Sequence, residues 1–421
     1  MNTWLTSNGP AIEAAAALRR LADEPVLLCL HGGGQGWTHV AWGMAEEPVR
    51  GCADLAVART SGASPAVSSA TTATTASAWS AEPSGSLVQL DYEFPAVAGR
   101  RWRLDAIASW NPAGGCRLRA RDAAGLERLR RGLLRPAAAV DPLRLAVPLV
   151  PTWDAAGHRD RVERIRALIS AGDLYQANLT LPMRGRLAPG RHRDLALFLA
   201  LSTASPAPYA AFFRSGGRSV VSHSPEGFLS CTGEHIVSEP IKGTRRRISG
   251  ADAQTRSELL ASAKDRAELA MIIDLVRNDL GRIAVAGSVR VVDAARVMDL
   301  PYVHHLVARI KALLRPGLTS ADVLAAAFPA GSITGAPKLR AMQVIHELES
   351  GPRGAYCGTF GWLGDTGDAE LAVAIRTLVV TGDDVRLDTG GGIVADSDPA
   401  AEWDEVRAKA DAMAAALEGS L

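Results

Sequence analysis

The sequence predicts an α+β fold in which large antiparallel β-sheets are flanked by helices. Strand-like and helix-like segments follow one another without the regular alternation that builds parallel sheets. Residues 159–183 contain one helix-like and one strand-like segment. The helix is expected to end at Gly172, and a strand is expected to follow it. The apolar residues of that helix recur at helical spacing, at Val162, Ile165, Leu168 and Ile169.

The segments after residue 183 support the same fold class. Helical periodicity predicts helices at residues 264–283, 321–331, 336–350 and 401–418. Strands are expected at residues 219–224, 288–293, 356–363, 370–380 and 384–394. The sequence shows no internal repeat.

The composition is that of a globular protein without a general charge signal for its partners. Of the 421 residues, 47% are hydrophobic and 22% charged, so the chain can bury a sizeable core. The formal net charge of +1 gives no reason to expect nucleic acid or an anionic membrane as a partner. No signal peptide or membrane span is recognisable. The five cysteines are widely spaced, which suits a reducing cytoplasm, and we expect a cytoplasmic protein.

Two changes in composition divide the chain. Residues 59–86 are rich in Ala, Ser and Thr, with almost no large apolar residues, so we expect a surface insertion that anchors no core. Prolines punctuate residues 135–157, which predicts a crossing segment there. We therefore expect a strand-rich N-terminal region over residues 1–150 and a second domain over residues 151–421.

Two glycine-rich motifs resemble known functional loops. Residues 31–36, HGGGQG, resemble an esterase oxyanion loop, but the chain has no GxSxG nucleophile elbow. A glycine turn in an N-terminal hairpin is the preferred interpretation, and hydrolase activity is the weaker one. Residues 390–394, GGGIV, do not open a helix, so they are no dinucleotide fingerprint. Their glycines do allow backbone N–H groups to approach an anionic ligand.

Two pairs of acidic residues have the same helical spacing. Asp265 and Glu268 lie three residues apart, as do Glu402 and Glu405, so each pair projects from one helix face. Brought together, the pairs would form an all-oxygen site suited to Mg²⁺. An isolated pair of this kind is usually a solvated helix face. Glu268, however, precedes an apolar stripe, which indicates that its face is partly turned inward.

Nine motifs resemble, in their order along the chain, those of the chorismate-utilising enzymes. They are GDLYQANLT, SPEGFL, EPIKGTRRR, KDRAELAMIIDLVRNDLGRI, VHHLV, FPAGSITGAPKLRAM, YCGTFGW, AIRTLVV and GGGIVADSDPAAEWDEVRAKA. The resemblance covers residues 158–415, and the first 150 residues resemble the family only loosely. The family includes anthranilate synthase component I, aminodeoxychorismate synthase component I, isochorismate synthase and salicylate synthase. The resemblance implies a chorismate-binding catalytic domain at residues 151–421.

Lys242 distinguishes the branches of this family. It stands in a turn expected after the strand-like residues 234–240, where anthranilate synthases resemble PIAGT and aminodeoxychorismate synthases resemble PIKGT. The resemblance implies that the Lys242 amine attacks C2 of chorismate and expels the C4 hydroxyl, and that ammonia then opens the adduct at C4. Glu226 of SPEGFL matches the family's general acid/base. Without the motifs, Lys242 is more simply a surface lysine and Glu226 a turn residue.

The resemblance also implies a magnesium site. Glu268 and Glu405 match direct ligands of Mg²⁺, while Asp265 and Glu402 match outer carboxylates that reach metal-bound water. Asp265 departs from the family's usual pattern, which more often has glutamate there.

Chorismate is the implied substrate, and its carboxylates need partners. Mg²⁺ would hold the ring carboxylate, while Arg376, expected in a strand, offers a bidentate fork for the enolpyruvyl carboxylate beside the hydroxyl of Tyr356. The N–H groups around Gly391 and Gly392 would complete this anion cradle. Further substrate-contacting positions match Gly243, Thr244, His305, Thr334 and Lys409.

Ammonia must come from elsewhere, because the chain has no GxCxG glutaminase loop. The resemblance implies a separate glutamine amidotransferase subunit as partner. Alternatives stay open: an anthranilate-type or isochorismate-type enzyme, which attacks C2, and a catalytically silent chorismate-binding subunit. The intact set of Lys242, Glu226, Glu268, Glu405 and Arg376 argues against a silent subunit.

Overall fold

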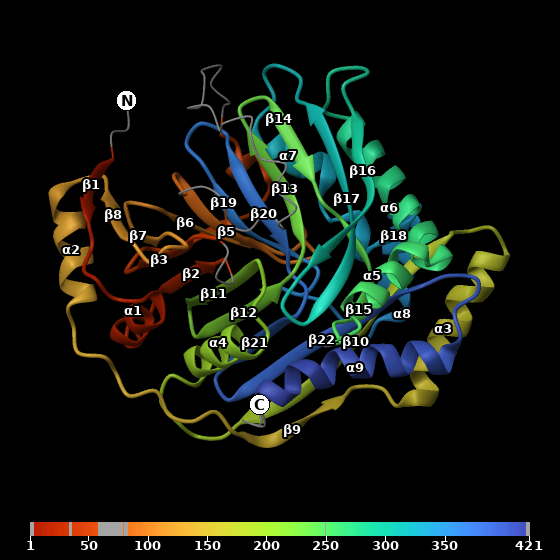
Figure 1. Ribbon diagram of the computed structural model, residues 1–421, viewed down its shortest axis with the longest axis horizontal. Coiled ribbons are helices and arrows are strands. Elements are labelled where there is room, and N and C mark those ends of the chain that lie inside the picture. The colour runs from red at the N-terminus through yellow and green to blue at the C-terminus, as the bar shows by residue number, and fades with distance from the viewer. Residues whose placement is uncertain (1–3, 33–35, 58–78, 80–82, 249, 418–421) are drawn as a thin grey trace.

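The computed structural model describes residues 4–417 apart from 33–35, 58–78, 80–82 and 249. The strands of these residues form two large sheets, which Figure 1 shows with helices around them. Every pairing between described strands is antiparallel. The predicted fold class is therefore confirmed.

The larger sheet runs across the whole molecule (Figure 1). Its strands, in spatial order, are β1 (Leu5–Asn8), β8 (Cys116–Ala120), β7 (Ala106–Trp110), β3 (Thr38–Trp42), β2 (Leu27–His31), β11 (Tyr209–Ser215), β12 (Arg218–Ser224), β21 (Thr377–Thr381), β22 (Asp384–Ile393), β10 (Gln176–Leu187) and β18 (Gly335–Ala336), with β9 (Leu145–Pro151) beside β10.

The smaller sheet carries the strand with Lys242 at one edge. Its order is β15 (Ile241–Arg246), β17 (Val303–Leu313), β14 (His235–Ser238), β13 (Gly227–Thr232), β20 (Ala369–Val373), β19 (Thr359–Leu363), β5 (Ser86–Leu90), β6 (Gly99–Arg103) and β4 (Glu47–Val49), with β16 (Arg290–Asp299) beside β17.

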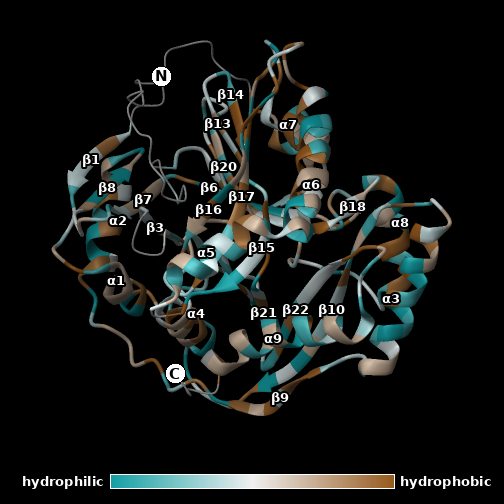
Figure 2. Ribbon diagram, turned by 45° about the vertical axis from the view of Figure 1, so that its right-hand side comes forward, coloured by the Kyte–Doolittle hydropathy of each residue, from teal (hydrophilic) through white to brown (hydrophobic). Residues whose placement is uncertain are grey.

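Helices pack around the sheets, and Figure 2 shows hydrophilic residues along the outer helix α3. The helices are α1 (Ala14–Arg20), α2 (Ala123–Leu133), α3 (Ala155–Ser170), α4 (Arg193–Ala204), α5 (Asp252–Ala261), α6 (Ala263–Gly281), α7 (Ser320–Ala327), α8 (Lys338–Leu348) and α9 (Pro399–Leu417), with short 3-10 helices at Cys52–Leu55 and Gly331–Ile333. Every helix predicted from periodicity is confirmed. None of those in the described ranges combines the length and apolar character that a membrane-spanning helix needs.

A core of aromatic and aliphatic side chains joins the two sheets. Phe213 of the larger sheet and Phe360 of the smaller one lie in this cluster, with ring centroids 5.9 Å apart. On the other side of the larger sheet, α3, α8 and α9 bury apolar residues against β10 and β22. Burial of this kind is the main favourable term in folding, so the two sheets form one packed body.

Strands from before and after residue 150 share both sheets. In the larger sheet β2 pairs with β11, and in the smaller sheet β5 pairs with β19. A boundary near residue 150 therefore does not separate two sheets, and the division into two domains stays a prediction about the sequence. β2 and β3 form the expected N-terminal hairpin, although residues 33–35 of its connection lie outside the described residues.

Trp79 corrects the expectation for residues 59–86, most of which lie outside the described residues. Its side chain is fully buried in the core between the sheets. The indole N–H donates a 3.3 Å hydrogen bond to the carbonyl of Ala210, and the ring lies edge-on to Tyr209 at 5.2 Å. The stretch does anchor a core at this position, because one aromatic residue buries as much apolar area as several small ones.

Candidate active site

Lys242 lies on β15 in a strand with a β-bulge, and not in the expected turn. Between Lys242, which faces Leu306, and Thr244, which faces His305, the register slips by one residue. The extra residue is Gly243, whose φ of 77° favours glycine. The bulge changes the direction in which neighbouring side chains point.

The Lys242 amine has no partner among the residues that the structure describes. Its Nζ forms neither a hydrogen bond nor an ion pair with any of them. Burial lowers the pKa of Lys242, and the carboxylates of Glu268 and Glu226 act against this by favouring the ammonium form. A Cβ at Gly392 of β22 would lie 3.3 Å from Nζ. A side chain at position 392 would therefore crowd the amine.

Glu226 lies between β12 and β13 with its side chain buried, and the residue is 4% exposed. Ser332 Oγ donates a 2.6 Å hydrogen bond to its Oε1, and the backbone N–H of Ile241 also donates to the carboxylate. Burial raises the pKa of Glu226 to about 7, although both hydrogen bonds and Lys242 limit the rise. Such a carboxyl group exchanges protons near neutral pH, as a general acid/base must.

Two helices present the four carboxylates expected at a magnesium site. α6 begins after Ser262, whose side-chain oxygen accepts a hydrogen bond from the backbone N–H of Asp265 and caps the helix. Glu268 follows on the same helix, and α9 carries Glu402 and Glu405. Three of the four carboxylates contact other side chains. Asp265 forms an ion pair with Arg245 at 2.8 Å, and Glu405 forms one with Lys409 at 2.7 Å. Glu402 accepts a hydrogen bond from the Ser397 hydroxyl at 2.7 Å.

Glu268 is the carboxylate that stays unpaired, with no hydrogen bond or ion pair to any described residue. Burial raises its pKa, Lys242 opposes this, and the charges of Asp265 and Glu405 add to the rise. In the described ranges no three His, Cys, Asp or Glu side chains lie close enough to form a metal cluster. The donor chemistry nevertheless fits Mg²⁺, which takes one or two carboxylates and keeps its remaining ligands as water or substrate oxygens.

The sequence predicted Arg376 within a strand, and this prediction is wrong. Arg376 lies at the point where the chain passes from one sheet to the other. Residues 370–380 split into β20 of the smaller sheet and β21 of the larger one, with Arg376 between them at φ 49°. Its guanidinium forms no hydrogen bond or ion pair with the described residues, and burial lowers its pKa. A buried cation without a counter-charge is a ready partner for an anionic ligand. Burial lowers the pKa of both His223 and His305, and the charge of Arg376 lowers it further, so these side chains are its neighbours.

Glycines of β22 let polar side chains come close to that strand. A Cβ at Gly390 would lie 3.2 Å from the Tyr356 hydroxyl, and one at Gly391 would lie 3.1 Å from Oε2 of Glu402. Together with Gly392 beside Lys242, the three glycines leave room along one stretch of β22 next to the candidate catalytic groups. The anion-binding role expected for the N–H groups of Gly391 and Gly392 stays a prediction.

Two residues of β10 were missed by sequence reasoning. Both polar atoms of the Gln176 side chain and the Nδ2 of Asn178 are buried without a hydrogen-bond partner among the described residues. The Gln176 amide nitrogen would lie 2.5 Å from a Cβ at Gly392, and Asn178 Nδ2 would lie 3.1 Å from one at Gly390. Buried polar groups normally find partners, so these two amides are available to bind a polar group of a ligand or a water molecule. The signal in the sequence is the alternation of polar and apolar residues in QANLT.

The remaining expected contacts differ in their placement. His305 is buried, its Nδ1 lies 2.8 Å from Thr244 Oγ1, and its Nε2 has no hydrogen-bond partner in the part of the chain that the structure describes. Lys409 donates to the carbonyl of Gly390 at 2.9 Å as well as to Glu405. Thr334 is buried, but its hydroxyl bonds to the carbonyls of its own loop at 3.1 and 3.2 Å. No contact of the Thr334 hydroxyl ties it to the other expected residues within the described chain.

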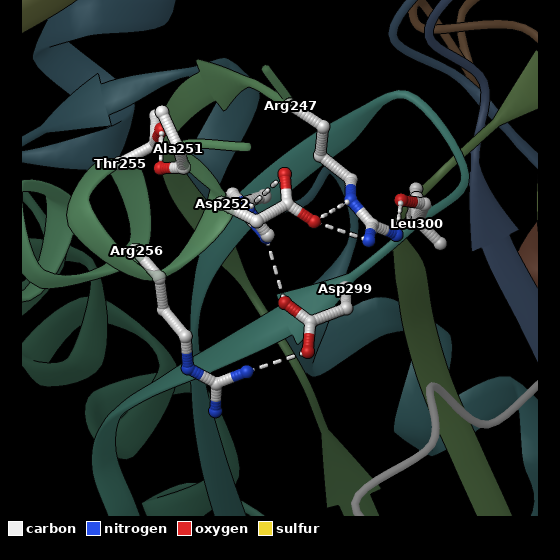
Figure 3. Close-up of polar contacts among 8 residues, drawn as sticks. Arg247, Ala251, Asp252, Thr255, Arg256, Asp299 and Leu300 are labelled. Carbon is white, nitrogen blue, oxygen red and sulfur yellow. Dashed lines mark hydrogen bonds and ion pairs between the residues drawn. The ribbon is translucent and has the colours of Figure 1, made fainter. Parts of the chain in front are cut away.

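Ion pairs attach α5 to the strands beside the site (Figure 3). Asp252, at the start of α5, accepts a 2.9 Å hydrogen bond from Arg247 Nε, and Arg256 pairs with Asp299 of β16 at 2.6 Å. His304, the neighbour of His305, lies with Nδ1 2.7 Å from Asp299 Oδ1. These contacts link α5 to the residue after β15 and to β16, and they link β16 to β17, while backbone pairing with β17 joins the strands themselves.

Comparison with known proteins identifies similar chains. The family model described as chorismate binding enzyme matches residues 117–415. Aminodeoxychorismate synthase component 1 of Salmonella typhimurium is 42% identical over 270 residues, which are 63% of this chain and 59% of that protein. Anthranilate synthase component 1 1 of Haloarcula marismortui is 44% identical over 264 residues, which are 62% of this chain and 53% of that protein. The chain thus matches little more than half of the length of these curated relatives.

Similarity of fold extends further along the chain than similarity of sequence. The crystal structure of anthranilate synthase component I from Streptococcus pneumoniae superposes with a TM-score of 0.77 at 25% identity, covering 90% of this chain and 92% of that one. The fold expected from the family resemblance is therefore confirmed.

Proposed function

The chain belongs to the chorismate-binding enzyme family, and from this premise we propose that it is an aminodeoxychorismate synthase component I, which aminates chorismate at C4. The observation that carries the proposal is the Lys242 amine, unpaired and with its pKa lowered by burial. Overall identity does not decide between the branches, because the Salmonella typhimurium and Haloarcula marismortui relatives are 42% and 44% identical. Lys242 does, since by the resemblance anthranilate synthases have alanine there.

The proposed reaction has two displacements. The neutral amine of Lys242 forms a bond to C2 of chorismate, both double bonds of the ring diene shift by one position, and the C4–O bond breaks while Glu226 donates a proton, so the hydroxyl leaves as water. Ammonia then bonds to C4, both ring double bonds shift back, and the C2–N bond breaks to return the amine of Lys242. The Glu226 carboxylate takes up the proton that the new amino group loses. The net change is chorismate plus ammonia to 4-amino-4-deoxychorismate plus water.

The two carboxylates of chorismate find separate partners in this proposal. The unpaired guanidinium of Arg376 would bind the enolpyruvyl carboxylate, with the Tyr356 hydroxyl and the N–H groups of β22 beside it. Glu268 and Glu405 would hold Mg²⁺, which supplies positive charge for the ring carboxylate when bound. Asp265 and Glu402 are proposed as outer carboxylates, and their contacts with Arg245 and Ser397 would orient them.

A second protein is part of the proposal. The relative's name, component 1, refers to a synthase with a further component, and we propose a glutamine amidotransferase subunit as the source of ammonia for this chain. The product would feed 4-aminobenzoate and folate synthesis. The cysteines in the described chain are free thiols, which supports a reducing compartment such as the cytoplasm.

Product identification tests the proposal. The purified protein is incubated with chorismate, Mg²⁺ and an ammonium salt, and the product is identified by liquid chromatography with mass detection. A product that keeps the enolpyruvyl group and converts to 4-aminobenzoate after addition of a lyase supports amination at C4. Anthranilate, isochorismate or salicylate would overturn it, and chorismate that binds without reacting even after a glutaminase subunit is added would support the silent-subunit alternative.

A further inference from the structure

We propose that Ser332 is a positioning residue that controls when Glu226 holds its proton, an inference that rests on the acid/base role proposed above. The Ser332 hydroxyl donates its 2.6 Å hydrogen bond to Oε1 of Glu226. Both residues are buried, with exposed fractions of 6% and 4%. A hydroxyl that donates to a carboxylate stabilises the ionised form. Ser332 would therefore make Glu226 release its proton at a lower pH than its buried position alone would set.

The segment before Ser332 is held by a half-buried lysine. Nζ of Lys338, at the start of α8, donates to the carbonyls of Ala327 and Pro329 at 2.9 and 2.8 Å. The same amine pairs with Asp279 of α6 at 2.6 Å. This pair joins α6 and α8 to the loop that carries Ser332.

The segment after Ser332 is held by a buried arginine. Arg353 Nη1 donates to the carbonyl of Ile333 at 2.9 Å, and Nη2 donates to the carbonyl of Asn178 at 2.7 Å. Its guanidinium also pairs with Glu349 at 2.8 Å, and both side chains are almost completely buried. Cations fixed on both sides of the short helix Gly331–Ile333 leave Ser332 little freedom, so its hydroxyl is preorganised toward Glu226.

The other groups around Glu226 have definable effects. From β15, the charge of Lys242 and the N–H of Ile241 both favour the carboxylate. Asp279 lines the same small cavity as Glu226, but its charge is balanced by Lys338. Ser332 is thus the side-chain hydroxyl whose hydrogen bond reaches the carboxylate. It is also the group that can be changed without removing a charge, which makes its contribution separable from that of Lys242.

The experiment follows the titration of Glu226 without requiring turnover. The carbonyl stretch of protonated Glu226 is assigned from the infrared difference spectrum between the wild type and Glu226→Gln, and is then followed with pH. We expect Ser332→Ala to raise the midpoint by about 1 to 2 pH units, a change of about ten- to hundredfold in the acid dissociation constant. Ser332→Thr keeps the hydroxyl and should titrate close to the wild type.

Ser238→Ala is the matched control. Ser238 is also 6% exposed and lines the same cavity, but its hydroxyl donates to the carbonyl of Phe228 at 2.9 Å. The midpoint should not move in this variant. A midpoint that moves equally in Ser238→Ala would overturn the proposal, as would an unchanged midpoint in Ser332→Ala. If Ser332→Ala does not fold, Ser332→Cys, with its weak S–H donor, decides in the same way.

A pH profile connects the titration to catalysis. The value of kcat is measured against pH at a constant concentration of unprotonated ammonia. In Ser332→Ala, the fall of kcat at alkaline pH should shift to higher pH together with the infrared midpoint, because Glu226 must hold a proton to donate it. Should the midpoint move while the wild-type product is not aminated at C4, the role of Ser332 stands and the proposed function fails. An alkaline limb that stays in place despite a moved midpoint would overturn the acid role of Glu226 on which the inference rests.

Discussion

Replacing Arg376 by methionine should make the free protein more stable while weakening its binding of chorismate. Arg376 is half-buried, and its guanidinium has no hydrogen-bond or ion-pair partner among the described residues. Removing an uncompensated charge ends a desolvation penalty, whereas removing the partner of a ligand carboxylate loses binding energy. Methionine adds no new backbone strain at φ 49°, because arginine already adopts this conformation.

The two effects differ in size. A buried polar group without a partner costs about 1–3 kcal/mol, so allowing for the poorer packing of methionine we expect the free energy of unfolding to rise by about 1–2 kcal/mol. A bidentate contact to a carboxylate has two hydrogen bonds to charged groups, each worth about 1.5–3 kcal/mol. Losing both should raise the Kd for chorismate by about a hundredfold or more.

Urea denaturation measures the stability, and isothermal titration with chorismate and Mg²⁺, without ammonia, measures the affinity. Arg386→Met is the control, because the Arg386 guanidinium is paired with the buried Asp388 at 2.8 Å and its loss should destabilise the protein. If Arg376→Met is also less stable than the wild type, the claim of an uncompensated charge is refuted. An unchanged Kd would refute the role of Arg376 in binding.

Three further predictions concern the reacting groups. Lys242→Ala should lose most of the ammonia-dependent product formation, measured by chromatography, while still binding chorismate, measured by calorimetry. As a control, Lys311→Ala, which changes an exposed lysine on the same sheet, should remain active. Near-normal turnover of Lys242→Ala would contradict the covalent mechanism. The pKa of Glu226 is raised from 4.5 to about 7, so the folded protein binds a proton that the unfolded chain has released, and stability should fall as pH rises through this window. In Glu226→Gln this loss of stability should be absent, a difference from the wild type of up to about 3 kcal/mol in the free energy of unfolding at about pH 8 and of little at about pH 4. Urea unfolding at both pH values measures the difference. If the stabilities of the wild type and the variant change with pH in parallel, the pKa of Glu226 is not raised. Chelation should abolish turnover until Mg²⁺ is restored, and full activity after chelation would rule out a magnesium requirement. In calorimetry, Glu268→Gln should weaken Mg²⁺ binding more than Asp265→Asn, because Asp265 is paired with Arg245 whereas Glu268 has no partner among the described residues.

Long periodic segments of the fold were predictable, and changes of direction were not. The helix with Glu268 was found because its apolar residues repeat over several turns. The break at Arg376 was missed because both flanking segments are apolar and neither glycine nor proline marks the point where the chain changes sheets. The bulge at Gly243 depends on pairing with β17, a strand about sixty residues later, which local patterns do not report.

For the site, the sequence supplied residue types and the structure supplied partners. Helical spacing placed Asp265 and Glu268 on one face, but not the ion pair of Asp265 with Arg245 or the lack of a partner for Glu268. Ser332 was within a recognised motif and yet unremarkable, because its importance comes from Glu226, more than one hundred residues earlier in the chain. Trp79 was misjudged for the same reason, since its burial depends on distant Tyr209.

The shared sheets have a consequence for how such a chain can change over time. Backbone hydrogen bonds between strands make few demands on side-chain identity, so the N-terminal strands β2 and β5 can keep pairing with β11 and β19 while their sequence drifts. The superposition on the Streptococcus pneumoniae structure covers 90% of the chain, whereas the sequence match to curated relatives covers 62% or 63%. A deletion of those strands would strip both sheets of neighbours and expose unpaired edges prone to aggregation. Selection can therefore preserve the strands of the N-terminal part while many of its amino acids change.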